Sequence, residues 1–481
     1  TRHSSLVTRH SSLVTLMRIA IIGNGVAGVT AARHLRKRWK AASIVLISEE
    51  TAHFFSRTAL MYIYMGHMRY EDTKPYPDDF WAKNRIELRR GRVERVDVGA
   101  KLLHFKQGQG EAERYDVLVL ACGSVPNRLP NLAGQDLIGV QGLYSYQDLE
   151  KLEARTPKIQ TAVVVGGGLI GVELAEMLLS RGKRVHFLVR EAGYWSNVLP
   201  KDEAEMVSAH LRAHGVELHL QEELSEIIAD KSGKEIAAVV TKSGERIDCE
   251  LLGLTAGVSP NVAWLRGLEG LEMNRGILVD ACLRTSLPDV WAVGDCVELR
   301  EPAAGRRAIE AIWYTGRMMG EVAAHNICAA AGAVAGGVLP YDAGVWFNSA
   351  KFFDIEYQTY GYVPSAQQAD ATVDSIFWQD EQGEHSIRVV YERTGEQAVV
   401  GFNVMGVRYR QEVCEKWIRT RATLAQVMAE LSLANFDVEF SKEYENAVRA
   451  AYSAKTGKAV ASTRKRGLAA VWAWLRGGGS R

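Results

Sequence analysis

Apolar residues along the first two thirds of the chain form short uninterrupted runs, each followed by a turn or a helical segment. Residues 19–22 and 43–47 are such runs, and others follow at 117–120, 163–165, 185–189 and 251–254. Continuous apolar runs of this length predict strands that are buried on both faces of a parallel sheet. Strands that alternate with helical segments predict an α/β fold made of βαβ units.

A glycine motif follows the first predicted strand. Gly23, Gly25 and Gly28 have the G-x-G-x-x-G spacing and lead into a run of helix-forming residues. In such a motif the glycines allow a tight turn, a close approach of a pyrophosphate and close packing of helix on strand. Glu49 follows the second strand, about 20 residues later, where a carboxylate can accept a hydrogen bond from a ribose hydroxyl. The pattern predicts a dinucleotide site.

The same pattern recurs in the middle of the chain. Gly166, Gly168 and Gly171 follow the run at 163–165, and residues 185–189 supply the second strand. Two βαβ units of this kind predict that the chain binds two nucleotides, each with its pyrophosphate at a helix N-terminus.

The C-terminal third differs from this pattern. A long helix is expected from about residue 309 to 331, and a Gly-rich linker follows as far as Pro340. Residues 387–391 and 398–403 predict an antiparallel hairpin around Thr394-Gly395, and the chain from Glu412 onward is expected to be helical. These patterns indicate an α+β domain followed by a helical tail.

Both ends of the chain need separate treatment. The heptapeptide TRHSSLV occurs at 1–7 and again at 8–14, which suggests a tag or a misassigned start for residues 1–16. The tail carries a basic stretch before one apolar helical face formed by Leu468, Val471, Trp472 and Leu475. Such a segment can lie on an anionic membrane, although a docked or frayed end is the simpler alternative.

Composition narrows the function classes. A net charge of +1 gives no reason to expect a nucleic-acid partner, and six dispersed cysteines suit a reducing cytoplasm. His210 and His214 have a metal-compatible spacing, but no third ligand accompanies them in the sequence. They are interpreted as a solvated helix face, and no metal site is predicted.

The glycine motifs occur in a fixed order with three other pieces. These are Ala121-Cys122-Gly123, Thr255-Ala256-Gly257 and the segment 285–295, which ends in Gly294-Asp295. From Met17 to about Met405 the chain resembles the two-dinucleotide flavoproteins, the pyridine nucleotide-disulfide oxidoreductase family of glutathione, ferredoxin, rubredoxin and nitrite reductases. The resemblance implies FAD in the first unit and NAD(P)H in the second, with Asp295 at the ribityl and pyrophosphate part of the flavin. It also places Ala121, Gly123, Gly257 and Gly294 at the cofactors.

The resemblance also implies a division into domains. The FAD domain is expected to be discontinuous, over 17–145 and 265–335, with the NAD(P)H domain inserted at 146–264. An α+β interface domain at 340–415 and a basic helical extension at 416–481 would follow. A homodimer is one arrangement in which such an interface domain is used.

Three further residues match positions that are functional in the family. Glu173 holds the place of a glutamate near the nicotinamide, with a plain helix residue as the alternative. Glu310 and Trp313 resemble the Glu-Ser/Thr-Trp stretch of ferredoxin reductases, which places an aromatic ring at the flavin. Trp313 is one position out of register, so a role in the core is an equal alternative.

Arg57 resembles the arginine of the Tyr-x-Arg stretch in ferredoxin and nitrite reductases. The disulfide reductases of the family carry redox cysteines near this position, whereas this chain has no cysteine between Met17 and Leu120. We expect Arg57 to hold a positive charge beside the flavin, with a surface or phosphate contact as the alternative. The lysine that follows in the ferredoxin reductase group is missing here.

These residues predict an enzyme that passes a hydride from NAD(P)H to FAD and then to an acceptor without a redox disulfide. Arg190 follows the second strand of the second unit and can pair with a 2′-phosphate, so NADPH is expected to be slightly preferred over NADH. The acceptor is a redox protein, a quinone or a small molecule. The alternatives are a membrane-surface quinone oxidoreductase and a redox-switch protein of the apoptosis-inducing-factor type. The expected location is the cytoplasm, with peripheral membrane contact left open.

Overall fold

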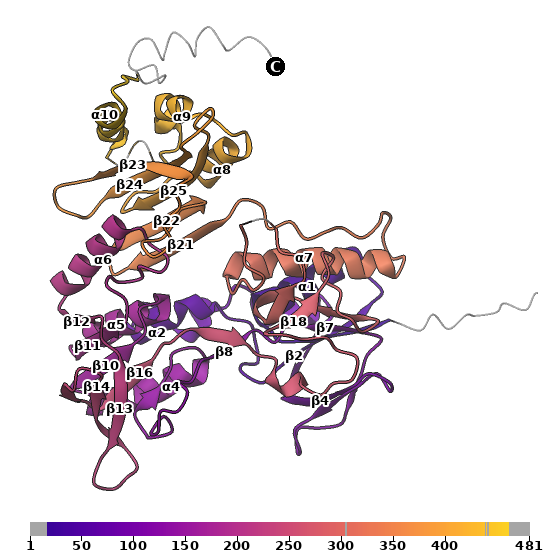
Figure 1. Ribbon diagram of the computed structural model, residues 1–481. Coiled ribbons are helices and arrows are strands. Elements are labelled where there is room, and N and C mark those ends of the chain that lie inside the picture. The colour runs from indigo at the N-terminus through magenta and orange to yellow at the C-terminus, as the bar shows by residue number, and fades with distance from the viewer. Residues whose placement is uncertain (1–16, 304, 438, 440–441, 461–481) are drawn as a thin grey trace, which may run out of the picture. The chain divides into compact units, whose positions relative to one another are not determined.

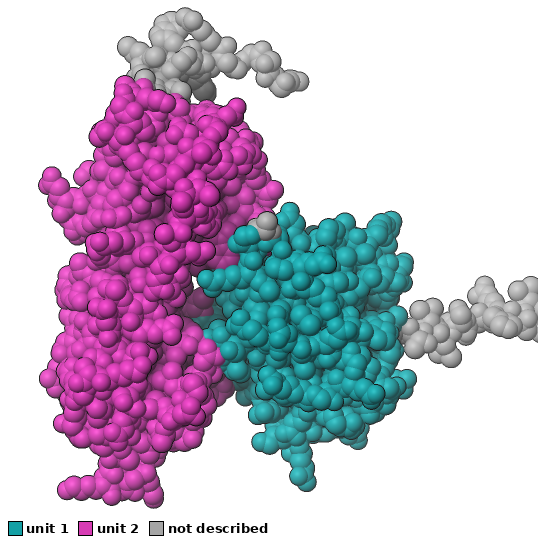
Figure 2. All heavy atoms as spheres, in the orientation of Figure 1, with its two compact units in different colours: residues 1–57, 69–125, 258–342 teal, residues 58–68, 126–257, 343–481 magenta. Residues whose placement is uncertain are grey.

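A computed structural model describes residues 17–303, 305–437, 439 and 442–460 (Figure 1). The chain forms two compact units, shown in different colours in Figure 2. Unit 1 comprises residues 1–57, 69–125 and 258–342, and unit 2 comprises 58–68, 126–257 and 343–481. The domain limits expected from the sequence stay predictions. The tandem heptapeptide and the amphipathic tail lie outside the described residues.

Unit 1 is built on a parallel sheet with the strand order β19-β7-β1-β2-β3. The apolar runs noted in the sequence form its central strands, and nearly all of their side chains are buried. This confirms the predicted α/β fold. The strands of the sheet are β1 (Arg18–Ile22), β2 (Ser43–Ser48), β3 (Ile86–Arg90), β7 (Val117–Leu120) and β19 (Val290–Ala292).

Smaller elements complete unit 1. They are the antiparallel strands β4 (Val93–Asp97), β5 (Leu102–Phe105) and β6 (Glu113–Arg114), the pairs β8 (Ser124–Pro126) with β17 (Val258–Pro260) and β18 (Ile277–Val279) with β20 (Val297–Leu299), the helix α3 (Phe80–Lys83) and the 3-10 helix η5 (Gly294–Cys296).

Two helices, α1 (Val26–Arg38) and α7 (Trp313–Ala330), lie against each other (Figure 1). A Cβ on Gly320 of α7 would be only 2.4 Å from the carbonyl oxygen of Ala27, so the two backbones approach closely because this glycine has no side chain. The expected start of the long helix at residue 309 is wrong. Ile312 has an extended backbone, and the helix begins at Trp313.

Unit 2 contains a second parallel sheet, with the order β12-β11-β10-β16-β9. The short helix α2 (Leu60–Tyr64) packs on α4 and α5 of this unit. A hairpin with the turn at Gly233 joins β13 to β14 in the three-stranded sheet β13-β14-β15. The elements are β9 (Val140–Gln141), β10 (Thr161–Val165), β11 (Arg184–Val189), β12 (Val216–Leu220), β13 (Leu224–Ala229), β14 (Ile236–Thr241), β15 (Arg246–Asp248), β16 (Leu251–Leu254), α4 (Tyr146–Arg155), α5 (Leu169–Ser180) and α6 (Lys201–Ala213).

The C-terminal part of unit 2 is an antiparallel sheet with the order β21-β22-β25-β24-β23. The predicted hairpin is confirmed as β24 and β25. The helices α8 and α10 pack on strands of this sheet (Figure 1). The elements are β21 (Phe347–Phe352), β22 (Ile355–Gly361), β23 (Val373–Gln379), β24 (Ser386–Glu392), β25 (Val399–Met405), α8 (Gln411–Arg419), α9 (Leu424–Glu430) and α10 (Glu445–Thr456). Among the residues that the structure describes, no helix combines the length and the apolarity that crossing a bilayer requires.

Candidate functional site

The first glycine motif joins β1 to α1 in unit 1. Gly23 has a φ of +113°, and a Cβ there would lie 2.1 Å from the carbonyl oxygen of Ala121. A Cβ on Gly28 would lie 2.0 Å from the carbonyl oxygen of Gly23, whereas a Cβ on Gly25 would meet no protein atom within 4 Å. Two glycines therefore serve packing, and the third borders open space.

The open space lies at the start of α1. Gly25 is the N-cap residue, no side chain caps the helix, and no acidic residue occupies the first turn. The first N–H groups of the helix are thus available to an anion, and the helix dipole favours a negative charge there. This geometry fits the pyrophosphate of the FAD implied by the sequence.

The second motif repeats this geometry in unit 2. A Cβ on Gly166 would lie 2.5 Å from the carbonyl oxygen of Thr255, and one on Gly171 would lie 2.5 Å from that of Gly166. A Cβ on Gly168 would meet no protein atom within 4 Å, and this glycine caps α5 without a side-chain contact. The residues fit a second pyrophosphate, as expected for NAD(P)H.

Two neighbouring acids stand at the end of β2. Glu49, the predicted ribose ligand, is exposed, and its carboxylate lies 3.9 Å from Nε of Arg92. Glu50 is mostly buried and accepts two hydrogen bonds from Arg57, at 2.9 Å from Nη1 and 2.5 Å from Nη2. Glu50 was not among the residues predicted from the sequence, where its position next to Glu49 was the available signal.

Arg57 lies near a second acid of unit 1. Burial raises the pKa of Asp295, and a hydrogen bond from Ser124 and the positive charge of Arg57 oppose that rise in part. The Oγ atom of Ser124 lies 2.9 Å from Oδ2 of Asp295. Three segments that are distant in sequence therefore bring a guanidinium, a hydroxyl and a carboxylate together. Ser124 follows Ala121-Cys122-Gly123, which was the only sequence signal for it.

Two cysteines lie beside this group. The thiols of Cys122 and Cys296 are hydrogen-bonded to each other, and this bond together with burial raises the pKa of Cys122 well above its ordinary value. Sγ of Cys296 also lies 3.4 Å from the carbonyl oxygen of Val293. The thiol of Cys122 is therefore a poor nucleophile, because the thiolate is the reactive form. The same contact lowers the pKa of Cys296, but the side chain of Cys296 is fully buried.

Glu310 and Trp313 lie before and at the start of α7. The carboxylate of Glu310 is buried and makes a bidentate ion pair with Arg306, at 2.6 Å and 2.7 Å. The side chain of Glu310 is therefore neutralised within unit 1, and its predicted catalytic role stays a prediction. Half of the surface of Trp313 is exposed, which rules out the alternative of a core residue.

Glu173 lies on α5 in unit 2. Burial, and the nearby charge of Glu176, raise the pKa of Glu173 to about 7. The ring of Tyr194 is fully buried, and its hydroxyl donates a hydrogen bond of 2.6 Å to the carbonyl oxygen of Gly168. Tyr194 thereby holds the glycine loop in place. Neither the residue type of Tyr194 nor its distance from the glycine motif indicated this role in the sequence.

Arg190 follows β11, and its guanidinium is mostly exposed. Its Nε lies 2.8 Å from Oε1 of Glu191, which is largely buried. A Cβ on Gly167 would lie 3.7 Å from the other oxygen of Glu191, so this carboxylate faces the second glycine loop. Gly257 follows β16 with a φ of +83°, and its carbonyl oxygen accepts a 3.0 Å hydrogen bond from the backbone of Asn127.

The pair His210 and His214 differs from the sequence-based interpretation as a solvated face. The side chain of His210 is only 10% exposed, and Asp354 from the β21–β22 turn lies 2.6 Å from its Nε2. The acid that the sequence lacked near these histidines is thus supplied by the fold.

Comparisons with known proteins agree with this geometry. The family model for the pyridine nucleotide-disulphide oxidoreductases matches residues 17–324. The rubredoxin-NAD(+) reductase of Pseudomonas putida is 31% identical over 314 residues, which are 65% of this chain and 80% of that protein. The NADH oxidase of Methanocaldococcus jannaschii is 31% identical over 322 residues, covering 65% of this chain and 70% of its own.

Solved structures share the fold. An NAD-dependent persulfide reductase from A. fulgidus superposes with a TM-score of 0.77 over 92% of this chain and 84% of its own, at 22% identity. A ferredoxin reductase from Rhodopseudomonas palustris gives a TM-score of 0.70 over 81% of this chain and 91% of its own, at 24% identity. The family match, the two glycine motifs and the two parallel sheets agree. The chain belongs to the pyridine nucleotide-disulphide oxidoreductase family and is an FAD-dependent NAD(P)H oxidoreductase.

Proposed function

We propose that this enzyme takes a hydride from NAD(P)H, with a slight preference for NADPH, and delivers electrons to a small redox protein without using a redox disulfide. The observation that supports this most directly is Arg57. It stands where disulfide reductases of the family carry cysteine, and its guanidinium is held by Glu50. Rubredoxin and ferredoxin reductases among the relatives suggest the class of acceptor.

Bound FAD would supply the chemistry of accepting a hydride and releasing electrons singly. The residues of unit 1 bind and tune it. The N-terminus of α1 at Gly25 would hold the pyrophosphate, and Asp295 with Ser124 would accept and donate hydrogen bonds along the ribityl chain. Because Glu50 fixes Arg57 with two hydrogen bonds, the positive charge is oriented before any ligand binds.

A thiol relay is disfavoured by where the cysteines lie. A disulfide substrate must be attacked by a thiolate, and arginine cannot do this. Cys122 and Cys296 lie in unit 1, but the pKa of Cys122 is raised, and Cys296, whose pKa is lowered, is fully buried. Disulfides such as glutathione disulfide are therefore not expected to be substrates.

Nucleotide choice depends on Arg190 and Glu191 in unit 2. Arg190 can pair with a 2′-phosphate, but only in competition with its present partner Glu191. Glu191 itself faces the glycine loop, where a carboxylate accepts a hydrogen bond from the 2′-hydroxyl of NADH. The two effects oppose each other, so we expect a preference for NADPH of less than about tenfold.

An anaerobic titration tests the proposal. The yellow holoenzyme is reduced with NADH or NADPH in a stopped-flow instrument and then mixed with rubredoxin, ferredoxin, a quinone, oxygen or glutathione disulfide. Fast flavin reduction and rapid transfer to an iron–sulfur or rubredoxin acceptor are expected. Efficient turnover of glutathione disulfide would contradict the absence of a thiol relay. Loss of acceptor reduction after alkylation of the reduced enzyme would contradict it as well.

Three substitutions test the residues. Arg190→Ala should lower kcat/KM for NADPH more than for NADH, while Glu191→Gln should do the opposite. Arg57→Ala should slow acceptor reduction or lower the flavin potential with FAD still bound. An unchanged NADPH to NADH ratio in Arg190→Ala would show that this arginine does not contact the 2′-phosphate.

A further inference from the structure

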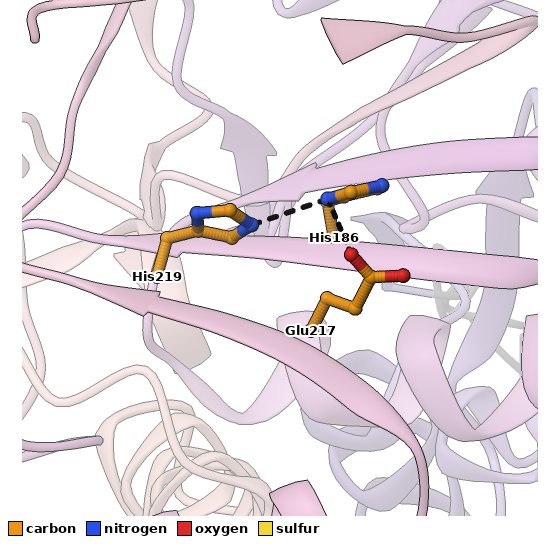
Figure 3. Close-up of side chains that lie close together, drawn as sticks. All are labelled: His186, Glu217 and His219. Atoms are coloured by element: carbon orange, nitrogen blue, oxygen red, sulfur yellow. Dashed lines mark hydrogen bonds and ion pairs between the residues drawn. The ribbon is translucent and has the colours of Figure 1, made fainter. Parts of the chain in front are cut away.

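A cluster of three metal-binding side chains lies on the parallel sheet of unit 2. His186 is on β11, and Glu217 and His219 are on the neighbouring edge strand β12. The two strands are parallel and His186 pairs with Glu217 in register. Since residues two apart on a strand share a face, all three side chains project to the same side of the sheet. Figure 3 shows them turned toward one another.

The ligand atoms of the cluster are spaced as a metal site requires. Nδ1 of His186 lies 3.1 Å from Nε2 of His219 and 3.3 Å from Oε2 of Glu217. The three ligand atoms all lie within 4.8 Å of one another. Tetrahedral zinc with bonds of about 2.0–2.1 Å separates its ligand atoms by about 3.3 Å. An ion can therefore be bound between these atoms with little movement of the side chains.

A fourth residue orients one of the ligands. Oε2 of Glu245, in the turn between β14 and β15, lies 3.6 Å from Nδ1 of His219. A carboxylate at the far ring nitrogen of a histidine favours the proton there and leaves the lone pair on the other nitrogen. Nε2 of His219, which faces His186, is then the metal-binding atom.

We propose that His186, Glu217 and His219 bind a divalent transition-metal ion, for which zinc is the best match, with Glu245 as a positioning residue. Two imidazoles and a carboxylate are ligands that zinc accepts, and a solvent molecule can fill the fourth position. The two carboxylates balance the charge of the ion. The histidines are largely buried while Glu217 is half exposed, so the ion can enter from solvent. Bound there, it would join β11, β12 and the β14–β15 turn.

A second cluster, made of two histidines and an aspartate, provides a matched control. His210, His214 and Asp354 also bring three ligand atoms together. However, Nε2 of His210 already makes a direct 2.6 Å hydrogen bond to Asp354, which is shorter than the separation of two ligands on one tetrahedral zinc. We therefore assign the ion to the first cluster.

Equilibrium dialysis of the untagged, FAD-loaded full-length protein against zinc chloride tests the assignment, after a chelator has removed bound metal. The wild type and the control variant His210→Gln/His214→Gln should retain zinc, while His186→Gln/His219→Gln should retain one zinc fewer per chain than the wild type. Glu245→Gln lies on an exposed turn and should weaken zinc binding by about 10- to 100-fold. Zinc should also raise the Tm of the wild type but not of His186→Gln/His219→Gln.

Three results would overturn the proposal. One is a wild type that binds no zinc, and another is equal binding by His186→Gln/His219→Gln. The third is loss of the zinc in the control variant alone, which would assign the ion to the His210 cluster. Because flavin content is measured on the same samples, a variant that fails to fold is recognised, and Glu245→Gln then decides.

Discussion

Gly25 allows the FAD site to be tested separately from the fold. A Cβ at Gly25 meets no protein atom within 4 Å, and its φ of −71° is allowed for any residue. Gly25→Ala should therefore change the free energy of unfolding of the protein without FAD by less than about 1 kcal/mol, because a weaker N-cap is offset by a less flexible unfolded chain. The added methyl group would instead occupy the space proposed for the pyrophosphate.

The expected loss of affinity follows from this crowding. Forcing an extra methyl group into a filled space costs about 1–3 kcal/mol, which corresponds to roughly 5- to 150-fold weaker FAD binding. Gly28→Ala provides the contrast, since its Cβ would lie 2.0 Å from the carbonyl oxygen of Gly23. That variant should lose stability even when FAD is absent.

Gly168→Ala is the matched change in the second motif. Gly168 is equally open and caps α5 with an extended backbone. This variant should purify with its full complement of FAD and show a raised KM or Kd for NADPH and NADH alike.

Flavin content by absorbance, FAD Kd by fluorescence and Tm of the protein without FAD measure these effects. If Gly25→Ala binds FAD within twofold of the wild type, the pyrophosphate does not lie at the start of α1. If Gly168→Ala loses FAD and keeps its nucleotide affinity, the assignment of the two motifs is reversed.

Two further predictions concern unit 2. Arg388 makes a bidentate ion pair with the fully buried Glu203, so Arg388→Met should lower the free energy of unfolding by about 3–5 kcal/mol. The control Arg408→Met breaks an exposed pair with Glu356 and should lower it by less than about 1 kcal/mol. Denaturant unfolding measures both values. The pKa of Glu173 is raised from 4.5 to about 7 in the folded protein, so the folded state keeps its proton longer and stability is lost as pH rises through this window. Glu173→Gln should remove up to about 3 kcal/mol of that loss, seen as a Tm that falls less between pH 5 and pH 8 than the wild-type Tm.

The sheets and glycine turns were predictable because their determinants are local. A buried parallel strand needs an uninterrupted apolar run, and β1, β7 and β10 show it in the sequence. The spacing of the glycines reports a backbone geometry that lies within a few residues. For the same reason the hairpin of β24 and β25 was found from the two segments that flank its turn.

The ion pairs and hydrogen bonds of the site could not be predicted in this way. Ser124 meets Asp295 across 171 positions, and His210 meets Asp354 across 144. Such contacts depend on which loops the sheets bring together, and no pattern within one segment encodes them. The start of α7 was misjudged because helix-forming residues precede Trp313, yet Ile312 has an extended backbone and the buried carboxylate of Glu310 pairs with Arg306.

The two nucleotide sites share a backbone scaffold but differ in how each holds its positive charge. At the end of β2, Glu50 binds the guanidinium of Arg57 through two hydrogen bonds, and the arginine comes from a separate segment. At the end of β11, Glu191 binds its own neighbour Arg190 through Nε alone, and 72% of the side chain of Arg190 is exposed. A bidentate pair fixes orientation, whereas a single contact between adjacent residues leaves the side chain free to choose another partner. The charge beside the predicted flavin is therefore preorganised, and the charge beside the predicted NAD(P)H ribose is adjustable. It follows that Arg57→Lys should impair electron transfer strongly, because lysine cannot reproduce the paired contact, whereas Arg190→Lys should retain much of the NADPH preference.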